Sequence, residues 1–140
     1  MTKTIAVRGT EKAESFSDRS VRLSGPAIRT FQNLADLWQL SVPERRTLLG
    51  SIPQSTYHKY ARDPDSARLS RDTLERISNL LGIFKAINVL LPRTESADAW
   101  VRRPNDAVLF KGRSALDYML TGRFDDLLDV RRYLDAERSW

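Results

Sequence analysis

The chain has 140 residues, of which 41% are hydrophobic, and this is enough for one good core or for two small cores joined closely. It has no cysteine and a single histidine, which excludes disulfides and thiolate metal sites and argues against a histidine metal cluster. We therefore expect no metal and no cofactor. No apolar run reaches the ~18 residues of a membrane span, and residues 1–20 lack the apolar centre of a signal peptide. A cytoplasmic protein is expected.

The net charge of +5 is concentrated in the first half of the chain. Residues 1–69 contain 11 Lys/Arg and 7 Asp/Glu, whereas residues 70–140 contain 12 and 11. A basic half beside a near-neutral half favours a polyanion contact in the first and a protein contact in the second. Most small basic domains are simply soluble, so the charge alone does not decide between these interpretations.

Residues 1–25 mix charged residues with Ser and Thr and show no apolar period, which predicts a flexible N-terminal arm. Gly25 and Pro26 should end this arm, with Pro26 in the first turn of a helix over about 27–39. The apolar residues of that helix recur at helical spacing, and they are Ile28, Phe31, Leu34, Ala35, Leu37 and Trp38.

Two consecutive capping-box patterns, each marking the start of a helix, predict two short helices separated by a glycine. Ser41 and Glu44 form the pattern of a capping box, and Gly50 suits the left-handed conformation at the end of the helix that follows. Ser51, with Gln54 three residues later, repeats the pattern and predicts the start of the next helix. Two short helices joined by such a turn are typical of a helix-turn-helix.

The second helix of this motif is rich in side chains that can bind base edges or phosphate oxygens. Together with two arginines of the first helix, the candidate DNA-binding residues are Arg45, Arg46, Gln54, Ser55, Thr56, His58 and Lys59. Ile52 and Tyr57 are expected to face the core instead. Any three-helix bundle contains a similar turn, so the spacing leaves a purely structural role open.

A long amphipathic helix should follow over about 71–91, with Ser70 as its N-cap and Pro92 as its stop. Its apolar stripe is longer than a three-helix bundle covers, so the helix should join two subregions. We expect most of the stripe to be intramolecular core, with a dimer seam as the alternative for part of it. The predicted organisation is an arm at 1–25, a helix-turn-helix and dimerisation region at 26–92, and a C-terminal region at 93–140.

The C-terminal region shows short helices separated by a loop, which makes the predicted fold class all-α. Ser96 should cap the first of these helices and Ser114 the second. Residues 106–113 should form an ordered loop held by Phe110. The breaks are predicted at Pro104-Asn105 and Thr121-Gly122, and the last helix at about 124–136.

The most specific signal of the sequence begins at Trp100. It consists of Trp100, Pro104, Asn105, Phe110, Gly112, Ser114 and Leu116, followed by Gly122, Val130 and Leu134. This pattern resembles the toxin-binding domain of MbcA/ParS/Xre-type antitoxins, in which the first seven of these residues would chiefly shape the domain. Ala115 stands where proline is usual, and Lys111 stands where glycine is usual. The resemblance covers about 96–136, and residues 26–92 look like the Xre-type region of such antitoxins.

The resemblance implies an Xre-like helix-turn-helix bundle joined by a long helix to a small helical toxin-binding domain. It further implies an antitoxin, without enzymatic activity, that pairs with a RES-domain toxin that consumes NAD. The C-terminal segment would cover the entrance of the toxin's active site, and the helix-turn-helix of a homodimer would bind operator DNA. Carried over to this sequence, the toxin-facing residues are Arg131, Arg132, Asp135, Glu137, Arg138 and Trp140.

Side chains of these types can block a nucleotide pocket. Arginines and carboxylates can take the places of phosphate or ribose partners, and a tryptophan can stack in a base slot. Each charged residue taken singly is equally typical of a solvated helix face. The alternative function is a stand-alone helix-turn-helix regulator whose C-terminal domain only dimerises. An enzyme is disfavoured, because the sequence has no cysteine, a single histidine and no glycine-rich phosphate loop.

Overall fold

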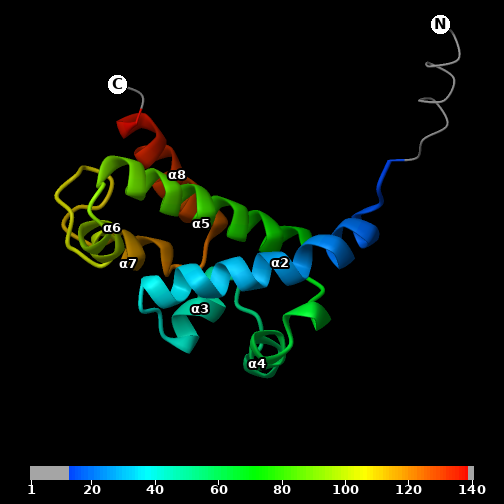
Figure 1. The fold of residues 1–140 in the computed structure, drawn as a ribbon. Coiled ribbons are helices and arrows are strands. Elements are labelled where there is room, and N and C mark those ends of the chain that lie inside the picture. The colour runs from blue at the N-terminus through cyan, green and yellow to red at the C-terminus, as the bar shows by residue number, and fades with distance from the viewer. Residues whose placement is uncertain (1–12, 139–140) are drawn as a thin grey trace, which may run out of the picture.

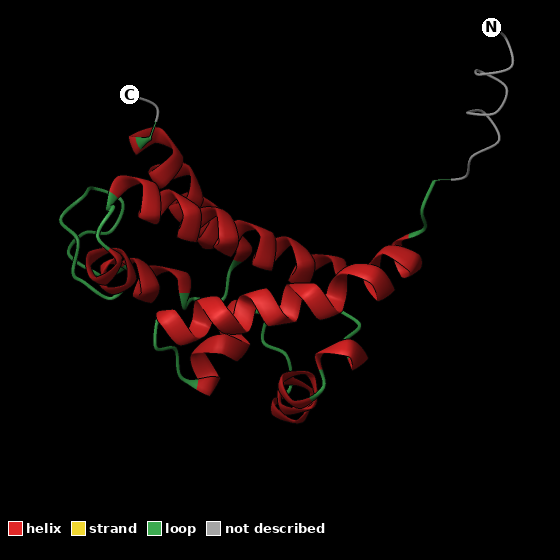
Figure 2. Cartoon of the chain, in the orientation of Figure 1, coloured by secondary structure: helices red, strands yellow, loops and turns green. Residues whose placement is uncertain are grey.

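The computed structural model describes residues 13–138, and within that range it contains seven α-helices, one short 3-10 helix and no strand (Figure 1, Figure 2). An isolated bridge pairs Pro104 with Ser114. The predicted all-α class is confirmed. In chain order the helices are α2 (Phe16–Leu37), α3 (Val42–Leu48), α4 (Gln54–Arg62), η1 (Pro64–Ser66), α5 (Arg71–Leu90), α6 (Thr94–Trp100), α7 (Ala115–Met119) and α8 (Phe124–Glu137).

The long helix α5 is the element shared by both halves of the molecule. It packs along α2 on one side and along α8 on another, and these are the two most extensive contacts between helices (Figure 1). The short helices α3 and α4 lie beyond α2, while α6 and α7 lie near the C-terminal end of α5. The expectation that one long helix joins two subregions is therefore confirmed.

A single hydrophobic cluster runs through both halves. Phe31 of α2 and Trp38, the C-cap of that helix, are almost fully buried in it, as are Leu80 and Ile83 of α5 and, from the C-terminal half, Phe110. Most of the apolar stripe of α5 is therefore intramolecular core, as predicted. A smaller part of the stripe, at Leu74 and Leu81, lines an open groove with Leu23, Pro26 and Ala27 of α2.

Helix α2 begins at Phe16, so the prediction that the first helix starts near residue 27 is wrong. Residues 16–25 of the predicted arm are helical, while residues 1–12 lie outside the described range. Two buried serines explain the extension: the Ser20 hydroxyl donates to the carbonyl of Leu69 at 2.9 Å, and the Ser24 hydroxyl accepts from the amide of Leu69 at 2.9 Å. These polar residues, which suggest a loop in the sequence, are therefore helical residues that hydrogen-bond to the backbone of a distant segment.

The serines predicted as helix N-caps were correct at three helices and wrong at two. Ser41 forms a capping box with Glu44, and Ser70 and Ser114 each accept a hydrogen bond from the third residue of the helix that follows. Ser51 caps nothing, because α4 begins after Pro53 and Ser51 lies in the turn with a φ of 63°. Ser96 is likewise not an N-cap, since α6 begins at Thr94, after Arg93.

Arg102 joins the C-terminal half to the helix-turn-helix half. Its Nε donates to the carbonyl of Trp38 at 3.1 Å, and its Nη2 donates to the carbonyl of Gln39 at 2.6 Å. The same Nη2 lies 3.1 Å from a carboxylate oxygen of Glu44. One guanidinium therefore binds carbonyls at the end of α2 and the capping-box glutamate of α3, which fixes how the two halves meet.

Candidate functional site

The turn between α3 and α4 is fixed by hydrogen bonds to its backbone. Arg46 Nε donates to the carbonyl of Ile52 at 2.9 Å, and Thr73 Oγ1 of α5 donates to the carbonyl of Leu49 at 2.8 Å. Gly50 has a φ of +100°, and a Cβ at this position would lie 3.0 Å from a carboxylate oxygen of Asp72. Glycine is required here both for its conformation and for the close approach of α5. The turn is a rigid support for α4.

Arg45 is placed inside this bundle. Its Nη2 forms an ion pair with Asp36 of α2 at 2.8 Å, its Nη1 lies 3.2 Å from Oε1 of Gln32, and its Nε donates to the carbonyl of Leu40. The phenol of Tyr57 from α4 donates to the same Gln32 oxygen at 3.1 Å. Burial of Arg45 acts to lower its pKa, yet the hydrogen bonds that its guanidinium donates to Asp36 and Tyr57, Asp36 first, raise the pKa overall. This network joins α2, α3 and α4.

The outer face of α4 carries most of the other predicted DNA-binding residues. Gln54, Ser55, His58 and Lys59 are exposed, and Thr56 is half-buried. Gln54 and His58 are one helical turn apart, and Nε2 of Gln54 lies 3.5 Å from Nε2 of His58. As predicted, Tyr57 faces the core, and Ile52 packs partly against it. Helix α4 therefore presents an exposed polar face, supported from behind by Tyr57.

One basic residue of this face, Arg62, was not among the predicted DNA-binding residues. Arg62 is exposed on the last turn of α4, three residues after Lys59 and four after His58. Side chains at these spacings lie on one face of a helix. The helical period alone could therefore have added Arg62 to the candidate residues.

In the C-terminal half, Phe110 is the centre of an aromatic cluster. Its ring is fully buried and meets Trp100, Tyr118 and Tyr133 edge-to-face, with centroid distances of 6.1, 5.8 and 5.2 Å. Such edge-to-face pairs add to the burial free energy of each ring. As predicted, Phe110 holds the loop, and it does so against α6, α7 and α8 together.

The loop before α7 explains both departures from the family pattern. Lys111 has a φ of 52°, in the left-handed region that glycine adopts without strain. The backbone therefore has the conformation expected for the glycine that is usual at this position. Ala115 is the first residue of α7 after the cap Ser114, and this is the position where proline is well tolerated. Asn105 closes the loop, because its side-chain oxygen accepts from the amide of Ala107 and its carbonyl accepts from the amide of Gly112.

The predicted toxin-facing residues of α8 divide into two groups. Arg131 packs inward, with its Nη1 3.3 Å from the side-chain oxygen of Asn79 on α5 and its Nε 3.2 Å from Asp135. The second group is exposed on the last turns of α8 and just after it, and consists of Arg132, Asp135, Glu137 and Arg138. Trp140 lies outside the described residues.

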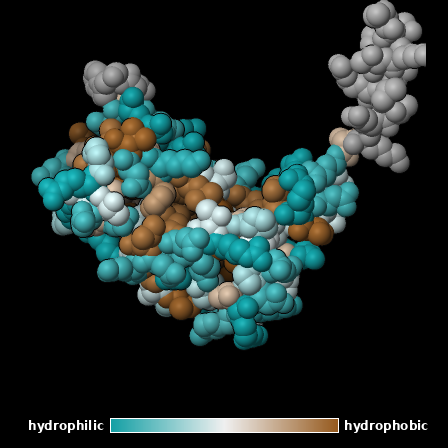
Figure 3. All heavy atoms as spheres, viewed as in Figure 1, coloured by the Kyte–Doolittle hydropathy of each residue, from teal (hydrophilic) through white to brown (hydrophobic). Residues whose placement is uncertain are grey.

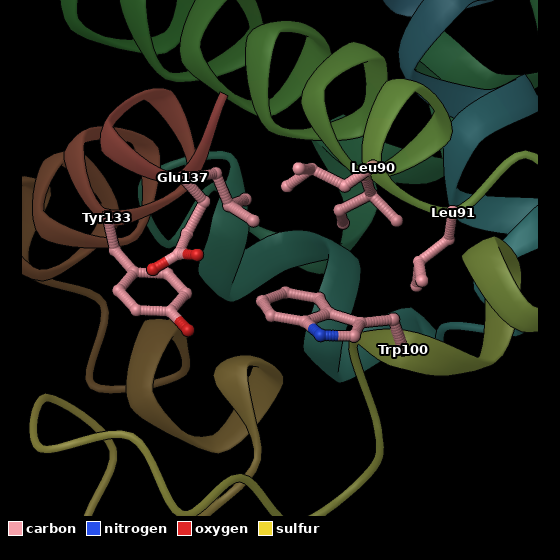
Figure 4. A pocket seen from close by; sticks show the side chains of 7 residues that line it. Leu90, Leu91, Trp100, Tyr133 and Glu137 are labelled. Carbon is pink, nitrogen blue, oxygen red and sulfur yellow. The ribbon is translucent and has the colours of Figure 1, made fainter. Parts of the chain in front are cut away.

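A pocket opens beside this exposed end of α8. It has a volume of about 200 Å³ and is lined by Ile87, Leu90, Leu91, Trp100, Tyr133, Leu134 and Glu137. Figure 4 shows the indole of Trp100 forming one wall, Leu90 of α5 and the adjacent Leu91 above it, and the Glu137 carboxylate near the Tyr133 ring. Burial, followed by the charge of Glu137, raises the pKa of Tyr133. Trp100 was predicted only to shape the fold, but its half-exposed side chain also forms this wall.

Within residues 13–138, no helix is long and apolar enough to cross a membrane. Over the same residues, no group of three or more His, Asp or Glu side chains converges in a way that could hold a metal ion. The viewed face is largely hydrophilic, with hydrophobic side chains gathered where α2 and α5 run together and near the end of α5 (Figure 3). The candidate surfaces are therefore the polar face of α4 and the end of α8 with its pocket.

Comparison with known families matches both halves of this chain. Residues 19–82 match the antitoxin Xre-like helix-turn-helix domain, and residues 86–139 match the antitoxin Xre/MbcA/ParS C-terminal toxin-binding domain. The chain is also 44% identical over 131 residues to the uncharacterized protein y4oB of Sinorhizobium fredii (strain NBRC 101917 / NGR234), covering 93% of this chain and 98% of that one. With a helix-turn-helix half and a toxin-binding half in this order, the chain belongs to the Xre/MbcA/ParS family of antitoxins.

Proposed function

We propose that this antitoxin neutralises a RES-domain toxin that consumes NAD by covering the entrance of the toxin's active site with its C-terminal segment. The observation that supports this most directly is the exposed, charged end of α8. Arg132, Glu137 and Arg138 lie at the end of the toxin-binding domain, and within residues 13–138 none of them takes part in an ion pair. Charged groups without internal partners are available to a second protein.

These side chains suit the entrance of a site that binds a dinucleotide. The guanidinium groups of Arg132 and Arg138 can bind the carboxylates that would otherwise position ribose hydroxyls, and the carboxylate of Glu137 can bind the cationic groups that hold phosphate. Trp140, which follows them, would fill an aromatic slot. In this proposal the antitoxin has no catalytic residue of its own and acts by obstruction.

Arg131 and Asp135 have a different role in the proposal. Both are held on α8 by their mutual ion pair, and Arg131 is further bound to Asn79 of α5. We therefore assign Arg131 to orienting α8 against α5, so that the residues after it point toward the toxin. Residues 132–140 remain the proposed contact segment.

We further propose that the helix-turn-helix represses the antitoxin's own operon. Helix α4 would enter the major groove with Gln54, Ser55, His58 and Lys59 toward the bases and phosphates. Thr56 and Arg46 would lie at the edge of this contact. Arg45 would act indirectly, because its guanidinium is bound to Asp36 and Gln32 and therefore sets the position of α4.

Operator binding of this kind calls for two copies of the chain. A helix-turn-helix dimer reads two half-sites about 34 Å apart, one on each turn of the duplex. We therefore propose a homodimer. The face of α4 and the end of α8 lie on opposite sides of the molecule (Figure 1), so one chain could hold DNA and toxin at once.

Co-expression tests the neutralising activity. The product of the neighbouring gene should arrest growth when it is expressed alone, and this chain should restore growth. A stand-alone regulator would restore nothing, because its C-terminal domain would only dimerise. If the chain restores growth equally well after the exposed end of α8 is removed, the obstruction mechanism is contradicted, although toxin binding is not.

The structure determines which truncation should be used. Deleting residues 132–140 would also remove Leu134, which is 2% exposed, and the Tyr133 ring that packs on Phe110. Loss of rescue would then report on folding as well as on contact. Deleting residues 138–140 alone leaves α8 intact up to Glu137 and tests only the last three residues of the proposed contact segment.

A further inference from the structure

The pocket at the end of α8 is a second place at which a toxin could be held. It shares Tyr133, Leu134 and Glu137 with the proposed contact segment, and its other walls come from residues 87–100. Every residue that lines the pocket lies between positions 86 and 139, within the toxin-binding domain. We propose that the pocket receives one large apolar side chain of the toxin, carried next to a Lys or Arg. This inference rests on the proposed binding of a toxin by this domain.

The size of the pocket favours a single side chain over a small molecule. Its volume is about 200 Å³, whereas pockets for small molecules and cofactors usually measure roughly 300–1,000 Å³. Ile87, Leu90 and Leu91 supply aliphatic walls, and Trp100 supplies a flat aromatic one. An anchor residue buried in a pocket of this kind is typical of the centre of a protein interface.

The charge at the rim indicates what accompanies the apolar side chain. The Glu137 carboxylate lies at the edge of the pocket beside the Tyr133 ring (Figure 4). Over residues 13–138, Glu137 takes part in no ion pair, although the adjoining turn of α8 contains the Arg131–Asp135 pair. A carboxylate left without a cation beside an apolar hollow complements a basic group on the partner. The anchor of the toxin should therefore be flanked by Lys or Arg.

Two neighbouring residues of α5 provide a matched pair of variants. Leu90 lines the pocket and is 36% exposed, whereas Val89 is 60% exposed and does not line it. Leu90→Gln places a polar group in the pocket without adding charge, and Val89→Gln makes a comparable change one residue away. Because both positions are already exposed, both variants should fold, which thermal unfolding of the free chain checks.

The affinity of each variant for the purified product of the neighbouring gene is then measured by calorimetry. Leu90→Gln should weaken binding by about tenfold or more, as expected for loss of an anchor contact, while Val89→Gln should bind like the wild type. Glu137→Lys should also weaken binding, and Glu75→Lys, the same charge change on an exposed residue at the other end of α5, should not.

The pocket assignment is overturned if Leu90→Gln binds the toxin as tightly as the wild type does. If the wild type itself fails to bind, the proposed toxin partnership falls, and the pocket assignment falls with it. Two measurements on the free chain cover other occupants. A change in sedimentation mass on Leu90→Gln would assign the pocket to a second copy, and a shift of the Trp140 indole signal would assign it to the chain's own terminus; either result overturns the proposal.

Discussion

The guanidinium of Arg131 on α8 lies directly against the backbone of Gly82 on α5, in space that the Cβ of any other residue would occupy. The same guanidinium reaches Asn79 one turn earlier on α5, at 3.3 Å. The glycine thus lets the two most extensively packed helices share a charged group between them. This contact fixes the rotation of α8, and with it the direction of the exposed residues at its end.

Gly82→Ala should therefore change stability by different amounts in two backgrounds. With Arg131 present, the new methyl group displaces the guanidinium and breaks its bond to Asn79, a loss of about 1 kcal/mol that offsets the gain in helix propensity. In an Arg131→Ala background the space is empty, and alanine should stabilise the helix by about 1 kcal/mol. Urea unfolding of the four proteins measures the coupling, and additive effects would contradict the contact.

Arg102→Ala should lower the free energy of unfolding by about 1–3 kcal/mol, because it leaves carbonyls at the end of α2 without their donor and removes the partner of Glu44. The neighbouring Arg103 serves as the control. Among the described residues, 13–138, its Nη2 donates only to the carbonyl of Ser96, within the C-terminal half, so Arg103→Ala should have a much smaller effect. Equal effects of the two changes would mean that Arg102 does not join the halves.

The pH dependence of stability should contain a contribution from Glu44. Burial acts to raise the pKa of Glu44, but hydrogen bonds from Ser41 and the Arg102 guanidinium outweigh it and hold the pKa below its usual value of 4.5. A carboxyl group with a depressed folded pKa stabilises the protein above its unfolded pKa, and this stabilisation is lost as the pH falls through the folded pKa.

Glu44→Gln should accordingly be less stable than the wild type at neutral pH, and the difference should shrink as the pH falls from about 5 to about 3. Urea unfolding at several pH values measures the gap between the two proteins. A constant gap over this range would show that the charge of Glu44 does not contribute to stability.

Binding to the DNA upstream of the gene should weaken as salt is added. If Lys59 meets a phosphate, Lys59→Ala should reduce the slope of log K against log salt by about one unit. Lys85→Ala is the matched control, because Lys85 is an exposed lysine of α5 and not of α4. Fluorescence anisotropy measures both slopes, and equal slopes for the two variants would remove Lys59 from the DNA contact.

Elements whose boundaries depend on nearby residues were predictable from the sequence. The capping box at Ser41, the caps at Ser70 and Ser114, and the bounds of α5 and α8 all follow from side chains within one helical turn. The early start of α2 was not predictable, because the hydroxyls of Ser20 and Ser24 are satisfied by Leu69, which lies 49 and 45 residues away. A local pattern carries no information about such a partner.

In the candidate site, the exposed faces were predictable from the sequence, whereas the contacts between helices were not. The polar character of α4 and the exposure of the end of α8 followed from composition and helical period. The internal roles of Arg45 and Arg131 did not, since their partners Asp36 and Asn79 come from other helices. The pocket also escaped the sequence analysis, because its walls exist only where α5, α6 and α8 meet.

Neutralisation by obstruction is tested most directly by the rate of NAD consumption by the purified neighbouring gene product, titrated with this chain. The full chain should stop NAD consumption at a fixed stoichiometry. The chain that lacks residues 138–140 should still bind the toxin in calorimetry but should leave much of its activity, because the segment over the active site is missing. Complete inhibition by the truncated chain, or no inhibition by the full chain, would contradict neutralisation by obstruction.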